Sequence, residues 1–323
     1  MADASRLAEG IRLDGPLPGA VVIVGMGGSA VAGDLLQGLW HERAPFPVHV
    51  VRGYTLPAWI GPDSLVVASS YSGGTEETLS AFAEARSRGG RALVVTSGGP
   101  LAEESSRAGI PWVRIPSGFP PRAALAYLLA PVLAVIEASW PTLSRAGERD
   151  EAIGVLARLG AELCPESPLA ANPAKQLAVW LTGRTPAVYG TDATAPVAYR
   201  WRTQLEENAK VLALSGILPE MNHIAIEAWG GAPGDHWAVV FLRDATEHPR
   251  VARRAALTRS ITEARVPTRE VWARGEGRLA RLLSLVLTGD WVSYYLALVR
   301  GVDPWAVDTL EAFKQRMTEE TGA

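Results

Sequence analysis

Residues 21–34 read VVIVGMGGSAVAGD, and this stretch decides the fold class. Four consecutive apolar residues lead through a glycine-rich turn into small residues at helical spacing, as expected for a buried strand followed by a helix. Four more short apolar runs occur in the first half, at 48–51, 65–68, 92–95 and 112–115. Stretches of helical length separate most of them, at 76–88, 101–107 and 122–140. The alternation predicts a doubly wound α/β domain with a parallel sheet covered on both faces.

The second half repeats this rhythm less clearly. We predict strands at 186–190, 237–241 and 270–272, and helices at 196–214, 250–264, 277–300 and 307–318. Both halves open with a strand, a small-residue turn and a helix, written GMGGSAVAG and YGTDATAPV, which indicates a weak internal repeat. Polar, proline-punctuated stretches at 141–150 and 164–173 suggest a boundary between the halves. We therefore expect two doubly wound α/β units, 1–145 and 146–323, with a C-terminal helix.

Composition excludes several classes of function. The 323 residues are 48% hydrophobic and 20% charged with a net charge of -3, so a disordered chain or a nucleic-acid-binding tract is not expected. The lone Cys164 permits no intrachain disulfide and no cysteine zinc cluster. The first ten residues lack the pattern of a signal peptide, and the uncharged stretch 123–136 is 14 residues, too short to span a bilayer. We expect a cytoplasmic protein without membrane or nucleic-acid partners.

The turn at 25–30 (GMGGSA) is suited to anion binding. Its glycines let backbone N–H groups approach a ligand, and the following helix N-terminus adds positive partial charge. A tight turn without a ligand is the plainer alternative. The spacing also satisfies a dinucleotide fingerprint, but the second strand ends in Arg52 and Gly53 instead of the acidic residue that NAD requires. Arg52 could serve a 2′-phosphate, so an NADP-dependent oxidoreductase stays as an alternative.

A second turn, SSYSGGTEET at 69–78, follows the strand at 65–68 and precedes a helix. Its hydroxyls, its glycines and the helix N-terminus can together bind a phosphate monoester dianion without a metal. The plainer alternative is a Thr75 helix cap, which requires only one hydroxyl. Because the turn offers several hydroxyls, we predict that it binds phosphate. A dinucleotide-binding fold does not require this second loop, which counts against the NADP alternative.

Together these motifs carry a specific resemblance. The two turns resemble the SIS (sugar isomerase) domain, and their spacing is similar to that of the archaeal-type bifunctional phosphoglucose/phosphomannose isomerases. The likeness continues in the same order through PRAA at 121–124, LEENAK at 205–210, PEMNH at 219–223 and Lys314. One departure is Gly74, where the family usually has asparagine. The resemblance covers most of the chain and implies two SIS-type units, the first binding sugar phosphate and the second carrying the catalytic groups.

An aldose–ketose isomerase needs a carboxylate base, a group that opens the sugar ring, and a cation beside the developing enediolate. The helical pattern alone leaves Glu206 and Glu207 nearly equivalent, with Glu206 expected to pair with Lys210. The family's Glu-Asn-x-Lys motif implies that Glu207 is the base. The resemblance further implies that His223 and Lys314 assist ring opening.

The same resemblance assigns the remaining site residues. Arg122 is implied to steady the enediolate, and the phosphate is implied to contact residues of the two turns, namely Gly28, Ser29, Ser70, Ser72 and Thr75. No metal or cofactor is expected. The implied reaction interconverts glucose 6-phosphate and mannose 6-phosphate with fructose 6-phosphate. The family also implies a homodimer in which His223 reaches the partner's site. A non-catalytic sugar-phosphate regulator built from the same units is the second alternative.

Overall fold

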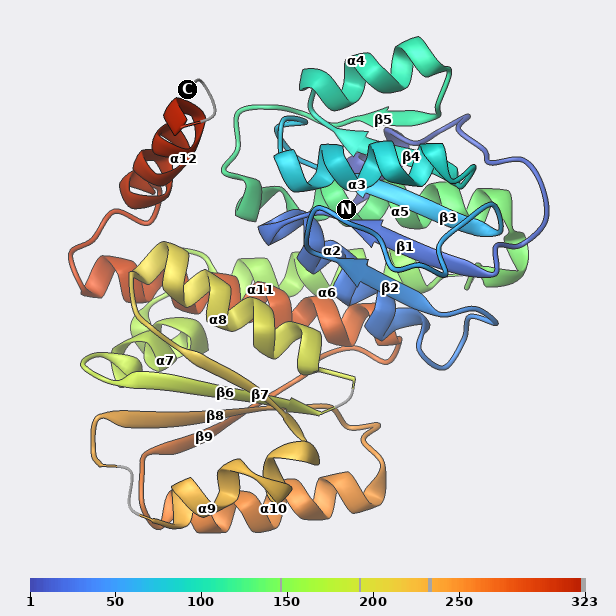
Figure 1. Ribbon diagram of the computed structural model, residues 1–323. Helices are drawn as coiled ribbons and strands as arrows, with labels where there is room; N and C mark the ends of the chain where they lie inside the picture. The colour runs from blue at the N-terminus through green and yellow to red at the C-terminus, as the bar shows by residue number, and fades with distance from the viewer. Residues whose placement is uncertain (146, 192, 232–233, 321–323) are drawn as a thin grey trace. The chain divides into compact units, whose positions relative to one another are not determined.

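A computed structural model describes residues 1–145, 147–191, 193–231 and 234–320 (Figure 1). The strands are β1 (Ala20–Val24), β2 (Val48–Val51), β3 (Ser64–Ser69), β4 (Arg91–Thr96), β5 (Trp112–Arg114), β6 (Thr185–Thr191), β7 (Leu214–Leu218), β8 (Trp237–Arg243) and β9 (Thr268–Trp272). The α-helices are α1 (Ala2–Arg6), α2 (Gly27–Trp40), α3 (Glu76–Ser87), α4 (Gly99–Ala108), α5 (Leu125–Ser139), α6 (Glu148–Leu163), α7 (Pro173–Leu181), α8 (Ala195–Ala209), α9 (Ala225–Gly230), α10 (Pro249–Glu263), α11 (Arg278–Val299) and α12 (Asp308–Glu320). Short 3-10 turns are η1 (Pro121–Ala124), η2 (Pro141–Leu143), η3 (Leu169–Ala171) and η4 (Glu220–His223).

The chain divides into two compact units that are not continuous in sequence. The first comprises Met1–Ala157, Asp192–Pro196 and Arg274–Ser284, and the second comprises the rest. From the sequence we expect two continuous units that meet at residue 145. In the structure each unit consists of several segments, and α6, α8 and α11 each contribute residues to both units. The segments Asp192–Pro196 and Arg274–Ser284 belong to the first unit although they come late in the chain, and no local sequence pattern predicts this.

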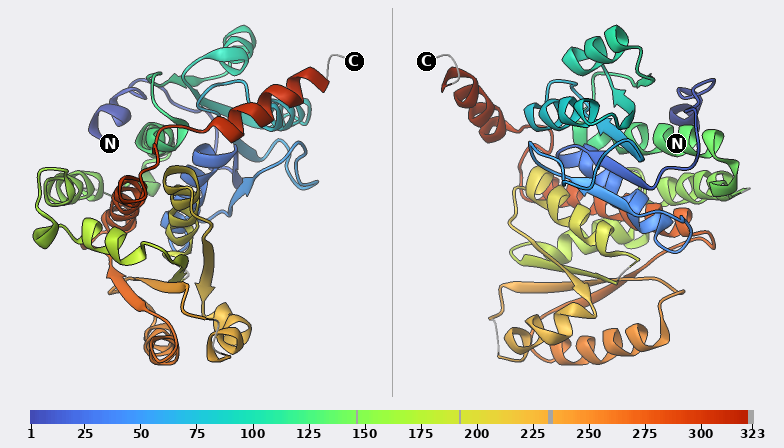
Figure 2. Two further views of the ribbon diagram at one scale, coloured as in Figure 1. Left: turned by 90° about the vertical axis from the view of Figure 1, so that its left-hand side faces the viewer. Right: turned by 45° about the vertical axis from the view of Figure 1, so that its right-hand side comes forward.

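The first unit contains a five-stranded parallel sheet in the order β2-β1-β3-β4-β5. Its central strands β1 and β3 are buried along their whole length, because helices cover both faces of the sheet (Figures 1 and 2). Helix α2 packs with α5, while α3 contacts β1, β3 and β4. This is the flavodoxin-like order, in which the chain changes direction across the sheet between β1 and β3.

The second unit contains a four-stranded parallel sheet in the order β7-β6-β8-β9. Helices α9 and α10 lie on one face, and α7 and α8 lie on the other (Figures 1 and 2). Its core on the α10 side packs Tyr189, Trp229 and Phe241 around the strands. The strand order matches the first four strands of the other sheet, which confirms the internal repeat; Asp192 of the repeat motif lies outside the described residues.

All eight strands predicted from sequence are present, and both sheets are parallel as expected. The helix predicted at 196–214 is wrong in its last turn, because α8 ends at Ala209 and β7 begins at Leu214. Lys210 has a positive φ of 55°, a conformation that terminates an α-helix. Helices α1, α6, α7 and α9 were not predicted, and the helix predicted at 122–140 begins as the 3-10 turn η1.

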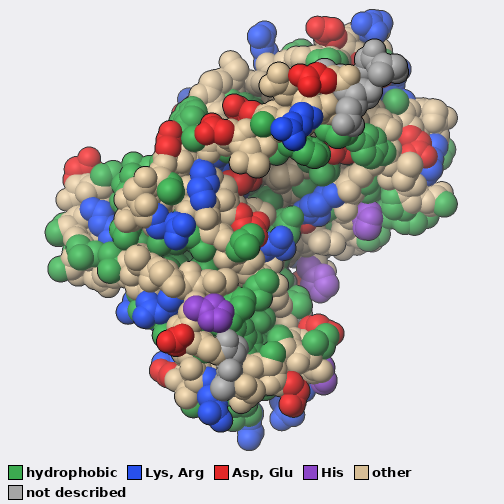
Figure 3. Space-filling view, turned by 60° about the vertical axis from the view of Figure 1, so that its left-hand side comes forward, with side chains coloured by type: hydrophobic (Ala, Val, Ile, Leu, Met, Phe, Trp, Pro, Cys, Tyr) green, Lys and Arg blue, Asp and Glu red, His purple; other side chains and the backbone are tan. Residues whose placement is uncertain are grey.

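Among the residues that the structure describes, two helices have the length and composition of membrane-spanning helices, Pro121–Ser139 and Arg278–Val299. About 61% of the apolar window of each is buried within the fold, as in the core helices of globular proteins. On the face in Figure 3, cationic and anionic side chains are interspersed and form no surface of a single sign. Such a mixed surface does not favour a polyanionic partner.

Candidate active site

The first glycine turn presses its backbone against neighbouring segments. A Cβ on Gly25 would lie 2.7 Å from the carbonyl oxygen of Ser69, and one on Gly28 would lie 2.9 Å from that of Pro121. A side chain at either position would therefore collide with backbone. Ser29 is buried in the first turn of α2, beside Gly25. The turn thus places the α2 N-terminus, where backbone N–H groups lack intrahelical acceptors, directly after β1.

In the second turn, the hydroxyl of Thr75 contacts another hydroxyl and does not cap the helix that follows. Thr75 occupies the N-cap position of α3, yet its side chain makes no capping hydrogen bond. Its Oγ1 lies 2.9 Å from the Ser70 hydroxyl, which also accepts the N–H of Gly73 at 3.1 Å. The Ser72 hydroxyl is exposed and accepts the N–H of Gly74 at 3.3 Å. Hydroxyls from both ends of the turn therefore converge at the start of α3, which does not fit the simple cap.

Both turns lie at the point where open α/β sheets bind ligands. They follow the carboxyl ends of β1 and β3, which are adjacent in the sheet, with Val24 paired to Ala68. Chain connections leave β1 and β3 toward opposite sides of the sheet, which makes this edge the topological switch point of the fold. The predicted phosphate residues Gly28, Ser29, Ser70, Ser72 and Thr75 all belong to these two turns.

Arg122 is placed against the first turn. It is the second residue of η1 and is only 6% exposed. Its Cα lies close to Gly28, since a Cβ added to that glycine would be 3.3 Å away. The structure therefore brings Arg122 together with the predicted phosphate residues of the first unit.

Arg52, on which the NADP alternative depended, is paired within the first unit. Its guanidinium contacts the Asp34 carboxylate of α2. Burial raises the pKa of Asp34, and the charge and hydrogen bond of Arg52 oppose that rise. Because this guanidinium is already bound to a carboxylate, a 2′-phosphate would have to displace it.

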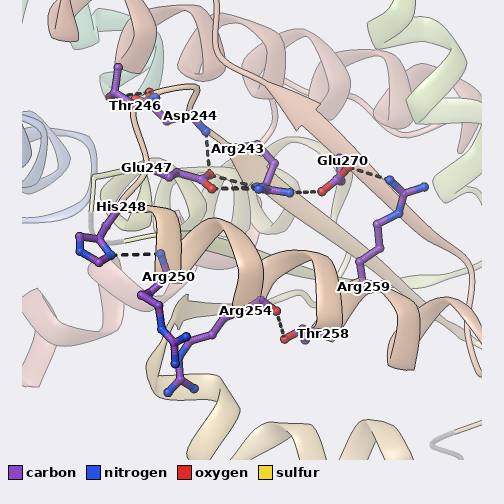
Figure 4. Close-up of polar contacts among 10 residues, drawn as sticks. All are labelled: Arg243, Asp244, Thr246, Glu247, His248, Arg250, Arg254, Thr258, Arg259 and Glu270. Atoms are coloured by element: carbon purple, nitrogen blue, oxygen red, sulfur yellow. Dashed lines mark hydrogen bonds and ion pairs between the residues drawn. The ribbon is translucent and has the colours of Figure 1, made fainter.

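The corresponding edge of the second sheet is closed by an ion cluster (Figure 4). At the carboxyl end of β8, the buried guanidinium of Arg243 lies between the carboxylates of Glu247, at 2.9 Å, and Glu270. Glu270 also pairs with Arg259 at 2.7 Å. Burial alone would lower the pKa of Arg243, but the hydrogen bonds and charges of the two carboxylates outweigh it and raise the pKa. Because the guanidinium groups of Arg243 and Arg259 are paired with these carboxylates, a phosphate would have to displace a carboxylate to bind them here.

Glu207 and Glu206 have different surroundings near the end of α8. Glu206 pairs with Arg202 at 3.0 Å, so the expected pair with Lys210 is wrong. The reason is that Lys210 has left the helix, and its side chain cannot follow the helical surface. Glu207 is half-buried, and its backbone carbonyl accepts a hydrogen bond from the Lys210 ammonium at 2.6 Å.

Lys210 also binds the segment that precedes α12. Its ammonium donates to the carbonyl oxygens of Asp303 at 3.1 Å and Ala306 at 2.7 Å. The helix that follows carries Lys314 and is exposed along its described length. Lys210 therefore connects the C-terminal end of α8, which carries Glu207, to the segment just before α12, which carries Lys314. The spacing of residues in the sequence did not indicate this role.

His223 ends η4, and its side chain is exposed. The two residues before His223 fix the turn to the fold. Met221 is buried in the core, and the side-chain amide of Asn222 donates a hydrogen bond to the Thr258 hydroxyl at 2.6 Å. Ile224, the next residue, is 65% exposed. Glu207, His223 and Lys314 thus lie on three different elements of the second unit, and their roles remain predictions.

Comparison with known proteins identifies the family. The SIS domain model matches residues 18–130, and the model of the bacterial phospho-glucose isomerase C-terminal SIS domain matches residues 170–317. A bifunctional phosphoglucose/phosphomannose isomerase from Caldicellulosiruptor bescii is 37% identical over 305 residues, which are 93% of this chain and 89% of that protein. The chain belongs to this isomerase family.

Other relatives agree. The bifunctional phosphoglucose/phosphomannose isomerase of Thermoplasma acidophilum is 33% identical over 318 residues, covering 97% of this chain and 95% of that protein. Among solved structures, a hypothetical protein from Thermus thermophilus superimposes with a TM-score of 0.78, 16% identity, and coverage of 100% of this chain and 87% of that one. At that identity the likeness concerns the fold alone. The resemblance to two-unit SIS isomerases that the motifs suggested is confirmed.

Proposed function

We propose that this phosphoglucose/phosphomannose isomerase family member interconverts glucose 6-phosphate and mannose 6-phosphate with fructose 6-phosphate, without a metal or other cofactor. The observation that carries the proposal is the second turn, where the Ser70 and Thr75 hydroxyls meet at 2.9 Å at the α3 N-terminus. Hydroxyl donors and a helix N-terminus can bind a phosphate monoester dianion without a metal cation. Family membership supplies the reaction class.

The chemistry follows from the open-chain sugar. His223 and Lys314 would open the ring by moving a proton onto the ring oxygen and removing one from the C1 hydroxyl. The Glu207 carboxylate would then take the proton from C2, giving an enediolate. A proton would move from the C2 hydroxyl to the C1 oxygen, and return of the C2 proton from Glu207 to C1 would form the ketose. Arg122 would stabilise the negative charge that develops on the enediolate oxygens.

One enediolate explains two aldose substrates. Glucose 6-phosphate and mannose 6-phosphate differ only in configuration at C2, and that difference disappears when C2 becomes planar. A single base can therefore serve both sugars, provided that either face of C2 can be presented to it. The phosphate turn would hold the far end of the sugar in both cases.

The test is conversion of each aldose phosphate by purified protein in excess EDTA. We expect fructose 6-phosphate from both substrates, and solvent deuterium at C1 of the product when the reaction runs in D₂O. A protein that binds the sugar phosphates but gives no product would instead be the non-catalytic regulator. Activity that EDTA abolishes would refute metal independence.

We also propose that the active unit is a homodimer in which His223 enters the partner's site. The support is the exposure of His223 on its turn and the exposed Ile224 beside it. Mixing inactive E207Q and H223A chains and letting subunits exchange would restore about a quarter of wild-type activity, because half the dimers are mixed and each has one intact site. A site built from one chain would recover nothing.

A further inference from the structure

Tyr71 joins the second turn to another segment of the site through its side chain. This side chain is buried, with 8% of the residue exposed. Its phenolic oxygen accepts the backbone N–H of Phe119 at 2.8 Å. Its own carbonyl oxygen accepts both the N–H of Ser97 at 3.0 Å and the Ser97 hydroxyl at 2.7 Å. Both ends of the residue are therefore fixed by hydrogen bonds.

The segment held by Tyr71 leads directly to Arg122. Phe119 is followed by Pro120 and Pro121, and Arg122 comes next. Two consecutive prolines restrict the backbone dihedral angles between these residues. Fixing the position of Phe119 therefore also restricts the position of the Arg122 backbone. From the other side, Gly28 of the first turn abuts the Arg122 backbone. Arg122 is thus held between the two glycine turns, and Tyr71 provides the connection to the second.

We propose that Tyr71 is a positioning residue that fixes Arg122 relative to the phosphate-binding turn. The inference rests on the proposed function, in which the turn holds the phosphate at C6 while Arg122 meets the enediolate at C1 and C2. Ser70 and Ser72, the neighbours of Tyr71, are predicted to contact that phosphate. Through its hydroxyl, Tyr71 therefore sets the span between the anchored end of the sugar and the charge that stabilises the reacting end.

The test is Y71F, which removes the hydroxyl and keeps the buried ring. We expect kcat to fall roughly five- to tenfold, because small displacements of a charge-stabilising group lower the rate of the chemical step. The KM for the sugar phosphate and the inhibition constant of inorganic phosphate should change less than about twofold. The matched control is Y127F: the Tyr127 ring lies 5.8 Å from that of Phe119, on α5, and its loss of a hydroxyl should leave kcat unchanged.

A double-mutant cycle with R122Q separates positioning from general stability. If Tyr71 acts through Arg122, Y71F lowers kcat in the wild-type background and changes it less than twofold in the R122Q background, measured at high enzyme concentration. An equal factor in both backgrounds would overturn the inference, as would equal kcat values for Y71F and Y127F. Absence of turnover in the wild-type protein would instead refute the proposed function.

Discussion

Gly73 gives the sharpest prediction about the proposed phosphate-binding turn. A Cβ at this position would lie 1.8 Å from the carbonyl oxygen of Gly98 and 2.8 Å from the Thr96 hydroxyl, with φ at 72°. Ordinary contact begins at 3.4 Å, so G73A must separate the turn from the loop after β4 by about 1.6 Å. The same movement disturbs the hydrogen bond from the Leu101 N–H to the Gly73 carbonyl, 3.0 Å long.

The expected magnitude combines two costs. A left-handed alanine costs about 1–2 kcal/mol, and overpacking against rigid backbone adds about 1–3 kcal/mol. We therefore expect G73A to lower the free energy of unfolding by roughly 2–5 kcal/mol. Since Ser70, Ser72 and Thr75 share the displaced turn, the KM for glucose 6-phosphate should rise at least about tenfold, which a coupled assay of fructose 6-phosphate formation measures.

The adjacent Gly74 provides the control. A Cβ there meets no atom within 4 Å, and its φ is not in the left-handed range. G74A should change the stability by no more than about 0.5 kcal/mol and KM by no more than about twofold. Equal KM values and equal thermal unfolding for the two variants would refute the reasoning, because the packing of the turn would then not depend on the contact at Gly73.

The remaining predictions concern cations and carboxylates away from the turn. K210M should lower kcat about tenfold, because it removes the hydrogen bonds that hold the segment just before the Lys314 helix. The control K175M removes two hydrogen bonds of 2.7 Å to other loop carbonyls and should leave kcat unchanged. Equal kcat values for the two variants would contradict this role of Lys210. Burial raises the pKa of Glu148, but hydrogen bonds from Arg43 and the Leu279 N–H outweigh it and lower the pKa below its ordinary 4.5. E148Q should therefore lose about 1–3 kcal/mol of stability in urea at pH 7, and this loss should shrink as the pH falls below 4.5 and through the lower pKa of the folded protein; a loss that grows in acid would contradict the assignment.

Local patterns predicted most of the elements because buried strands such as β1 and β3 are largely continuous apolar runs. They failed at β7, where LSGIL at 214–218 follows a helical pattern and contains a glycine. Gly216 is required there because a Cβ would lie 2.5 Å from the Tyr189 ring on the neighbouring strand. That contact joins residues far apart in the sequence, so no window around 214 could show it.

The arrangement of the candidate site was predictable only in part. The two turns were evident because glycines and hydroxyls stand directly after apolar strands, and strand order then places them together. The connections between segments were not evident, since the Tyr71 hydroxyl bonds a backbone N–H 48 residues away. Likewise, Lys210 appeared to be an ion-pair partner of Glu206, and only its positive φ directs it to backbone carbonyls instead.

The account depends most on Glu207 as the base that removes the C2 proton, and the kcat of E207Q tests this directly. Glu206 is the matched control, because it is the adjacent carboxylate on the same helix and pairs with Arg202. We expect E207Q to lower kcat by a factor on the order of 10³ with an unchanged inhibition constant for phosphate, and E206Q to stay within about threefold of wild type. Turnover by E207Q within threefold of wild type would contradict the account.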